Sequence, residues 1–262
     1  MVKDYFYHES NIIGKCRDVK GNAYRRICHE MASFKESCYD PYKIEQLKIT
    51  GISREDISKK VALLNAYYPL ADQFNEQYKI TSQAKFRPTI LEEFCGFLLK
   101  DIPAIESLGL DFFNKAVFAG ITLDKEGYAK IKTKNIDFCI GKEFNVDIEG
   151  DTRSLVIPVI AIECKTYLDK TMFSEAQFTA QKMKQGSPNV RVYVVAESNQ
   201  VDKNEIPTKG RTPVDQIYII RGNPKNPINE TAVDELFSDI KSELEHLTID
   251  AKINEIGRMI VD

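Results

Sequence analysis

Three residues of the chain combine side-chain types and spacing that suit the chemistry of phosphate esters: Asp137, Glu163 and Lys165. Glu163 and Lys165 end the long apolar run 155–165, and Asp137 interrupts the apolar segment 134–140. Because side chains alternate along a strand, Glu163 and Lys165 leave the same face. Charged groups at the end of a buried strand must be paired, reach solvent or bind a metal ion. The pattern therefore predicts a charged site where a strand ends.

Two carboxylates on neighbouring strands repel each other unless a cation lies between them. Asp137 and Glu163 would form such a pair, and a hard divalent ion such as Mg²⁺ prefers their oxygen atoms as ligands. The bound ion would polarise a phosphodiester and lower the pKa of a water molecule. Lys165 would orient or activate that water, or neutralise the charge that develops on the phosphate. These residue types predict Mg²⁺-dependent hydrolysis with no covalent enzyme intermediate.

The spacing of apolar residues predicts the elements that would hold this site in place. The predicted helices cover 51–74, 89–100, 169–185 and a C-terminal segment that starts at Thr231. The predicted strands cover 134–140, 155–165, 190–197 and 216–222. Their order along the chain predicts an α/β core with a mixed central sheet flanked by helices.

Three finer expectations concern the ends and faces of these elements. Ser53 and Asp56 are spaced as a capping box at a helix start, and Pro69 is expected to end or kink that helix. Pro158 cannot donate a hydrogen bond to a sheet, so the central strand is expected to begin after it. Alternation within 134–140 predicts one face with Ile136, Phe138 and Ile140 and another with Asn135, Asp137 and Cys139.

Length and composition suit an ordinary globular protein of one large or two small domains. The chain has 262 residues, of which 43% are hydrophobic, and a net charge of −3. We expect residues 1–82 to form a helical region, DNA-binding or structural, and residues 83–262 to form the catalytic core with its C-terminal helix. Residues 230–262 hold 9 acidic and 3 basic residues, so the near-neutral total does not exclude a DNA ligand. With no apolar run near the roughly 18 residues of a membrane span, we expect a cytoplasmic protein.

The six cysteines form no CxxC pair. Reduced thiols in a cytosolic protein account for them. The alternative is a zinc site built from Cys16, Cys28, His29 and Cys38, although their spacing fits no standard finger.

Asp137 followed by Glu163-Cys164-Lys165 at the end of an apolar strand resembles the PD-(D/E)XK nuclease motif. The chain departs from that motif because no proline precedes Asp137. The resemblance implies a core of helix, three strands, helix and strand over residues 89–197. It also implies that Asp137, Glu163 and the backbone carbonyl of Cys164 bind Mg²⁺.

A helix before the motif often supplies a further acidic residue in these nucleases. Glu92 or Glu93 would take that part here, and their spacing does not separate them.

A closer likeness extends over residues 85–94, 162–172 and 214–221. These stretches resemble the BbvCI-like Type II restriction endonucleases, whose active enzyme consists of two related subunits. The resemblance implies that the chain cuts one strand of double-stranded DNA at a specific short sequence. Cutting both strands would then need a dimer, either a homodimer or a heterodimer with a related subunit.

Several basic residues are candidate DNA contacts, because arginine and lysine bind phosphates and guanine. The candidates are Lys85 and Arg87 before the helix at 89–100, and Lys203, Lys209 and Arg211 in the loop after the strand at 190–197. For this loop, a plain surface role is the alternative. A second basic run at residues 15–26 would contact phosphates or form a solvated face.

Two other functions stay open from the sequence. One is a nuclease of the same core that acts in DNA repair or on modified DNA. The other is a DNA-binding subunit with an idle site, which would bind DNA but not Mg²⁺.

Overall fold

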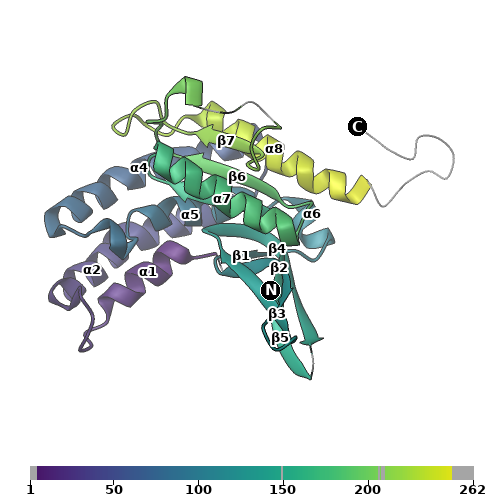
Figure 1. The fold of residues 1–262 in the computed structure, drawn as a ribbon. Helices are drawn as coiled ribbons and strands as arrows, with labels where there is room; N and C mark the ends of the chain where they lie inside the picture. The colour runs from purple at the N-terminus through teal and green to yellow at the C-terminus, as the bar shows by residue number, and fades with distance from the viewer. Residues whose placement is uncertain (1–4, 149, 206, 208–209, 250–262) are drawn as a thin grey trace.

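The computed structural model describes residues 5–148, 150–205, 207 and 210–249, with helices in the N-terminal third and a sheet after them (Figure 1). The helices are α1 (Tyr7–Cys16), α2 (Cys28–Phe34), α3 (Asp40–Lys48), α4 (Arg54–Tyr78), α5 (Pro88–Leu99), α6 (Pro103–Ser107), α7 (Lys170–Gly186) and α8 (Glu230–Ile249). The strands are β1 (Asp111–Phe113), β2 (Ala116–Leu123), β3 (Ala129–Asn135), β4 (Phe138–Ile148), β5 (Asp151–Lys165), β6 (Arg191–Ala196) and β7 (Gln216–Ile219). Short turns of other helix types are η1 (Arg25–Ile27), η2 (Lys35–Tyr39), η3 (Ser82–Ala84) and η4 (Lys203–Glu205).

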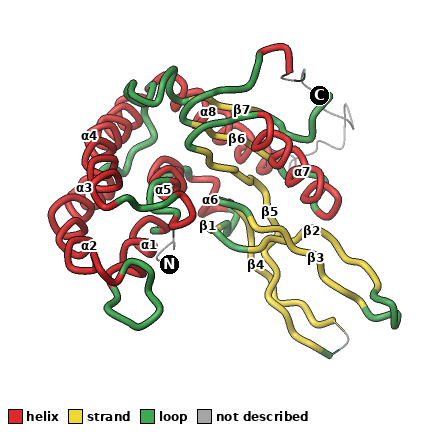
Figure 2. Tube along the Cα trace, turned by 60° about the vertical axis from the view of Figure 1, so that its left-hand side comes forward, coloured by secondary structure: helices red, strands yellow, loops and turns green. Residues whose placement is uncertain are grey.

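The central sheet has five strands in the order β1-β4-β5-β6-β7. β1, β4 and β5 pair in antiparallel fashion, whereas β5, β6 and β7 are parallel. The predicted mixed sheet is therefore confirmed. β2 and β3 form a separate antiparallel hairpin, and Figure 2 shows this hairpin and the outer halves of β4 and β5 projecting from the body as two arms.

The segment 134–140 is not one strand, and this prediction was wrong. β3 ends at Asn135 and β4 begins at Phe138, so Ile136 and Asp137 lie where the chain passes from the hairpin into the sheet. The break also changes the faces. Ile136 is buried in the same cluster as Cys139, whereas Phe138 and Ile140 belong to the cluster on the other face.

β5 runs through Pro158 rather than starting after it. Gly141 of β4 pairs with Pro158, whereas the preceding Ile140 pairs with Ile160, so β5 carries one extra residue at a bulge. β6 pairs with β5 only from Ile160 onward. Pro158 therefore lies at an irregular edge, where a missing N–H costs little.

The capping box of α4 is confirmed, because the Ser53 side chain accepts from the Asp56 N–H and the Asp56 side chain accepts from the Ser53 N–H. Pro69 does not end α4, which continues to Tyr78. Tyr67, Tyr68 and other buried side chains on either side of the proline hold the helix against the core. Tertiary packing thus outweighs the hydrogen bond that the proline removes.

Two hydrophobic clusters cover the two faces of the sheet. One contains residues from α1 to α5, from α8 and from one face of the strands. The other lies between the opposite face and α7. The first cluster spans both sides of residue 82, and the division of the chain at that residue stays a prediction. No described helix is both long and apolar enough to span a lipid bilayer.

Candidate active site

Asp137, Glu163 and Lys165 meet at the junction of β4 and β5. Phe138 pairs with Ile162, which places Asp137 beside Glu163 across the two strands. The Lys165 Nζ atom donates to Glu163 Oε2 at 2.7 Å and to Asp137 Oδ2 at 3.3 Å. The backbone N–H of Cys164 also donates to Asp137 Oδ2, at 3.1 Å. The structure therefore brings together the three residues that the sequence singled out.

Glu92 faces this group from α5. Its side chain is buried, and the Asn114 amide donates to Glu92 Oε2 at 2.7 Å. Burial and the nearby Asp137 carboxylate raise the pKa of Glu92 to about 7. The sequence did not point to Asn114, which lies between β1 and β2 outside any chemical motif.

Glu93, the next residue, faces the N-terminal helices instead. It accepts hydrogen bonds from the backbone N–H groups of His8 and Glu9, at 3.0 and 3.1 Å, and from the Tyr39 hydroxyl at 2.9 Å. Its carboxylate therefore caps the start of α1. Burial raises the pKa of Glu93 to about 8. The structure thus places only Glu92 at the Asp137 group.

The site contains more acidic than basic side chains. Asp137, Glu163 and Glu92 face Lys165, and a second ammonium, that of Lys85, lies 3.9 Å from Asp137 Oδ1. Burial and the Asp137 charge raise the pKa of Glu163. The opposing carboxylates raise the pKa of Lys165 despite its burial. Removing carboxylate charge, or adding a cation, would relieve the repulsion.

The described side chains contain no group of three or more His, Cys, Asp or Glu residues already spaced as metal ligands. The zinc alternative at Cys16, Cys28, His29 and Cys38 is therefore wrong for the part of the chain that the structure describes. At the Asp137 group, the Lys165 ammonium lies against both carboxylates. The donors still fit a hard divalent ion, because they are carboxylate oxygens with an excess of negative charge.

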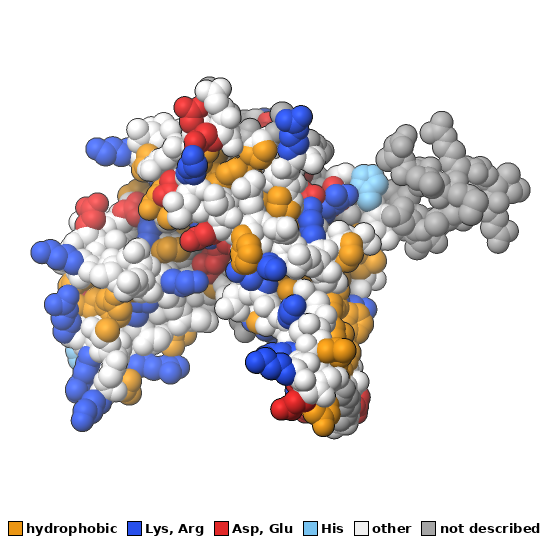
Figure 3. Space-filling model, viewed as in Figure 1, with side chains coloured by type: hydrophobic (Ala, Val, Ile, Leu, Met, Phe, Trp, Pro, Cys, Tyr) orange, Lys and Arg blue, Asp and Glu red, His pale blue; other side chains and the backbone are white. Residues whose placement is uncertain are grey.

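The group lines a cleft of about 860 Å³. Besides Lys165, three lysines line it, Lys85, Lys115 and Lys134, together with residues of α7 such as Glu175. Figure 3 shows basic side chains on both sides of the hollow between the helical half and the projecting arms. An acidic centre inside a basic cleft suits a bound cation and an anionic polymer.

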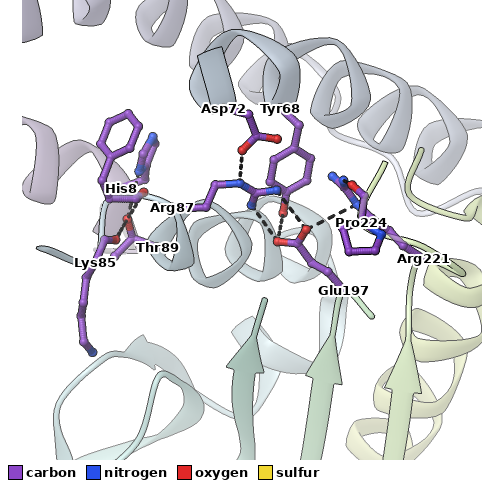
Figure 4. Close-up of polar contacts among 10 residues, drawn as sticks. His8, Tyr68, Asp72, Lys85, Arg87, Thr89, Glu197, Arg221 and Pro224 are labelled. Atoms are coloured by element: carbon purple, nitrogen blue, oxygen red, sulfur yellow. Dashed lines mark hydrogen bonds and ion pairs between the residues drawn. The ribbon is translucent and has the colours of Figure 1, made fainter. Parts of the chain in front are cut away.

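A second charged cluster lies behind the cleft (Figure 4). The Arg87 guanidinium donates two bonds to the Glu197 carboxylate, at 2.7 and 2.9 Å, and its Nε donates to Asp72. The Tyr68 hydroxyl donates to Glu197 at 3.2 Å. Arg221 approaches from the other side, with Nε 3.4 Å from Glu197 Oε2 at an ion-pair distance without hydrogen-bond alignment.

This cluster joins the helical half to the strand that carries the site. Tyr68 and Asp72 belong to α4, and Arg87 immediately precedes α5. Glu197 follows β6, and its backbone N–H donates to the Lys165 carbonyl at 3.0 Å. Glu197 was not selected from the sequence, yet it ends a buried strand with a carboxylate just as Glu163 does.

The predicted DNA contacts fall in different surroundings. Lys85 is exposed in the cleft, and Arg211 is exposed in the loop before β7. Arg87 points into the protein, where its donors bind Glu197 and Asp72, so its predicted role as a DNA contact was wrong. The Lys203 side chain and the whole of Lys209 lie outside the described residues.

Comparison with known proteins shows the family of the chain. The profile of the Bpu10I restriction endonuclease family matches residues 83–232, which include the Asp137 group and the elements that position it. The chain belongs to the Bpu10I restriction endonuclease family. It is therefore a nuclease, and the predicted relationship to Type II restriction endonucleases is confirmed. No curated protein matches the sequence of the chain.

Among solved structures, the fold is similar to that of a chain of the native BbvCI A2B2 tetramer. The TM-score is 0.73 at 16% identity, over 98% of this chain and 100% of the other. The likeness includes the N-terminal helices, which the family profile does not cover. At this identity it shows a common fold, in agreement with the predicted architecture.

Proposed function

We propose that this restriction endonuclease hydrolyses phosphodiester bonds of double-stranded DNA at a specific short sequence with Mg²⁺, cutting one strand per active site. The proposal rests on one observation. Asp137 and Glu163 line a cleft together with several lysines, Lys165 contacts both of these carboxylates, and the buried Glu92 lies close to Asp137. This combination serves a divalent cation and a phosphate together, which no other described part of the molecule does.

Each residue of the site would have a different role in the reaction. Asp137, Glu163 and the Cys164 backbone carbonyl would hold Mg²⁺, which when bound supplies a Lewis acid for the phosphate and an acidic water. Lys165 would hold the attacking water and balance the charge that grows on the phosphate oxygens. Glu92 would add negative charge on the far side of Asp137, with Asn114 fixing its orientation. The Cys164 N–H holds Asp137 in place.

One site of this kind cuts one strand, so a double-strand break requires two chains. We propose that two site-bearing chains associate on DNA, either as identical copies or as related subunits. The similar solved structure is described as an A2B2 tetramer, which supports an assembly of more than one chain.

Cleavage of a supercoiled plasmid with Mg²⁺ tests the proposal. Wild type is compared with Glu163→Ala and with Glu175→Ala, a matched control on an exposed carboxylate of the same cleft. We expect wild type and the control to cut and Glu163→Ala to be inactive. Discrete linear fragments would indicate a self-sufficient, sequence-specific enzyme, and nicked circles a chain that needs a related partner.

Two results would contradict the proposal. Unspecific degradation, or cutting of modified DNA only, would favour a repair or modification-dependent nuclease. DNA binding without Mg²⁺ binding or cleavage would favour a subunit with an idle site.

A further inference from the structure

A row of lysines follows strand β3 away from the cleft. Lys130, Lys132 and Lys134 alternate along the strand, so their side chains leave the same face of the hairpin. Their partners on β2 are Thr122, Gly120 and Val117, which add no charge to that face. The charged side chains of the two strands are therefore all lysines.

The inner end of this row enters the cleft. Lys134 lines the cleft, and its Nζ lies 5.8 Å from the centre of the Phe178 ring on α7. Lys182, also on α7, places its Nζ 5.4 Å from the same ring. Phe178 itself is 54% exposed at the edge of the cleft. Two elements thus present ammonium groups around one exposed aromatic ring.

The charge of these four lysines is not neutralised within the described structure, where none lies within 4.0 Å of an acidic group. Nearby lysines behave differently. Lys115 pairs with Glu143, Lys170 with Glu205 and Lys184 with Asp215. Figure 3 shows basic side chains that follow one another from the hollow down the projecting arm. The positive field of this surface is therefore open to an external anion.

Side chains on one face of a strand repeat at roughly 7 Å, so the row from Lys134 to Lys130 extends the basic surface by about 14 Å beyond the cleft. Double-stranded DNA carries one negative charge per roughly 1.7 Å of its axis, and a polyanion of that density complements a row of free ammonium groups. A solvated edge strand that uses lysine to prevent aggregation is the plainer explanation. It does not account for Lys182 on α7 or for the row ending at the reactive group.

We propose that Lys130, Lys132, Lys134 and Lys182 form a backbone-binding track, which holds DNA phosphates beside the cut site and guides the duplex into the cleft. This inference rests on the proposed function, since it concerns the same substrate. The track positions DNA by charge and reads no base.

The test is the salt dependence of DNA binding by the full chain. Affinity for a random-sequence 30-base-pair duplex is measured without divalent metal at several salt concentrations, for wild type and for Lys130→Gln/Lys132→Gln. Each lost phosphate contact reduces the slope of log K against log salt by about 0.9. The double variant should therefore lose about 1.8 from the slope. Lys130→Arg/Lys132→Arg should keep the wild-type slope, because it keeps both charges.

Lys225→Gln/Lys241→Gln is the matched control, since it removes the same charge from the loop after β7 and from α8. It should leave the slope within about 0.3 of wild type, a margin far smaller than one contact. Light scattering on every variant shows whether the change acts through aggregation instead.

A slope for Lys130→Gln/Lys132→Gln equal to that of the control would overturn the track while leaving the nuclease proposal intact, provided that wild type binds and cuts DNA. If wild type neither binds nor cuts DNA, the proposed function fails and the track fails with it. Aggregation of Lys130→Gln/Lys132→Gln with an unchanged slope would establish the edge-strand role in its place.

Discussion

The two buried charge clusters on either side of the Lys165 backbone are built from similar residues but balance their charges differently. Behind the cleft, the Glu197 and Asp72 carboxylates meet two guanidinium groups, and Glu197 is only 3% exposed. At the cleft, Asp137 and Glu163 share Lys165, Lys85 lies farther from Asp137, and the buried carboxyl of Glu92 adds a third acidic group. The first cluster has two carboxylates and two guanidinium groups, so its charges balance, and we call it the complete cluster. The second has more acidic than basic groups, and we call it the incomplete cluster.

The difference separates a structural role from a chemical one. A buried carboxylate that is paired and hydrogen-bonded fixes the elements around it, and the Glu197 cluster fixes α4, α5 and β6. Unbalanced carboxylates repel each other and are retained where a ligand compensates for the repulsion. Burial raises the pKa values of Glu92 and Glu163, and the neighbouring Asp137 charge raises them further.

The largest expected change in free energy comes from breaking the complete cluster. Arg87→Met removes both bonds to Glu197 and leaves a buried carboxylate underpaired, which costs about 3–5 kcal/mol of unfolding free energy. Urea denaturation measures the loss. Arg87→Lys should recover only part of it, because lysine cannot form the two-bond contact. A loss below about 1 kcal/mol would mean that the pair is no stronger than a surface ion pair.

Removing Lys165 from the incomplete cluster should affect mainly the rate of DNA cleavage. Lys165→Ala should reduce the rate of DNA cleavage by roughly 10²–10³-fold, since it removes the group that balances charge on the phosphate. Duplex affinity should stay close to wild type. The unfolding midpoint should fall, because Glu163 and Asp137 lose the ammonium that they share, but by less than in Arg87→Met, since the Lys165 side chain is partly exposed. Lys115→Ala, in the same cleft but paired with Glu143, should cut within about tenfold of wild type, well short of that loss. Equal losses in both variants would show that Lys165 contributes only to the general field.

Relief of the repulsion should have a smaller and opposite effect on stability. Asp137→Asn removes one of the three carboxylate charges, so in the absence of divalent metal the unfolding free energy should stay level or rise by about 1 kcal/mol. Glu197→Gln should lower it under the same conditions, because Arg87 and Arg221 lose their partner. Urea midpoints of the two variants, compared with wild type, check the contrast. A clear loss in Asp137→Asn would remove the distinction between the clusters.

The last prediction concerns the pH dependence of stability and Glu93, the neighbour of Glu92 that faces the other way. Its pKa is raised from its ordinary value of 4.5 to about 8, so the folded protein holds a proton that the unfolded chain releases. Stability from this group is therefore complete below pH 4.5 and is lost as pH rises to about 8. The urea midpoint of wild type should fall relative to Glu93→Gln across that window. Parallel pH profiles would show that Glu93 is already ionised at low pH.

The sequence predicted the mixed sheet and the three residues that meet at the site, but not where all of the strands begin and end. Asp137, Glu163 and Lys165 stood out because charged residues interrupt or end apolar runs, and that signal depends only on local pattern. Most of β3 was not predicted because its sequence alternates lysine with few strongly apolar residues, and the break at Ile136 depends on how the hairpin joins the sheet. The roles of Glu92 and Glu93 could not be separated because every residue of α5 from Thr89 to Leu99 is buried, so only tertiary packing distinguishes its faces.

The most direct measurement is calorimetric titration of Mg²⁺ into the full chain at pH 8, comparing wild type, Asp137→Asn and Glu197→Gln. If the incomplete cluster is the cation site, wild type and Glu197→Gln bind Mg²⁺, whereas Asp137→Asn shows at least a tenfold weaker affinity, or about 1.4 kcal/mol. Equal binding by wild type and Asp137→Asn, or no binding by wild type with DNA present, would contradict the assignment of the cleft carboxylates to a metal.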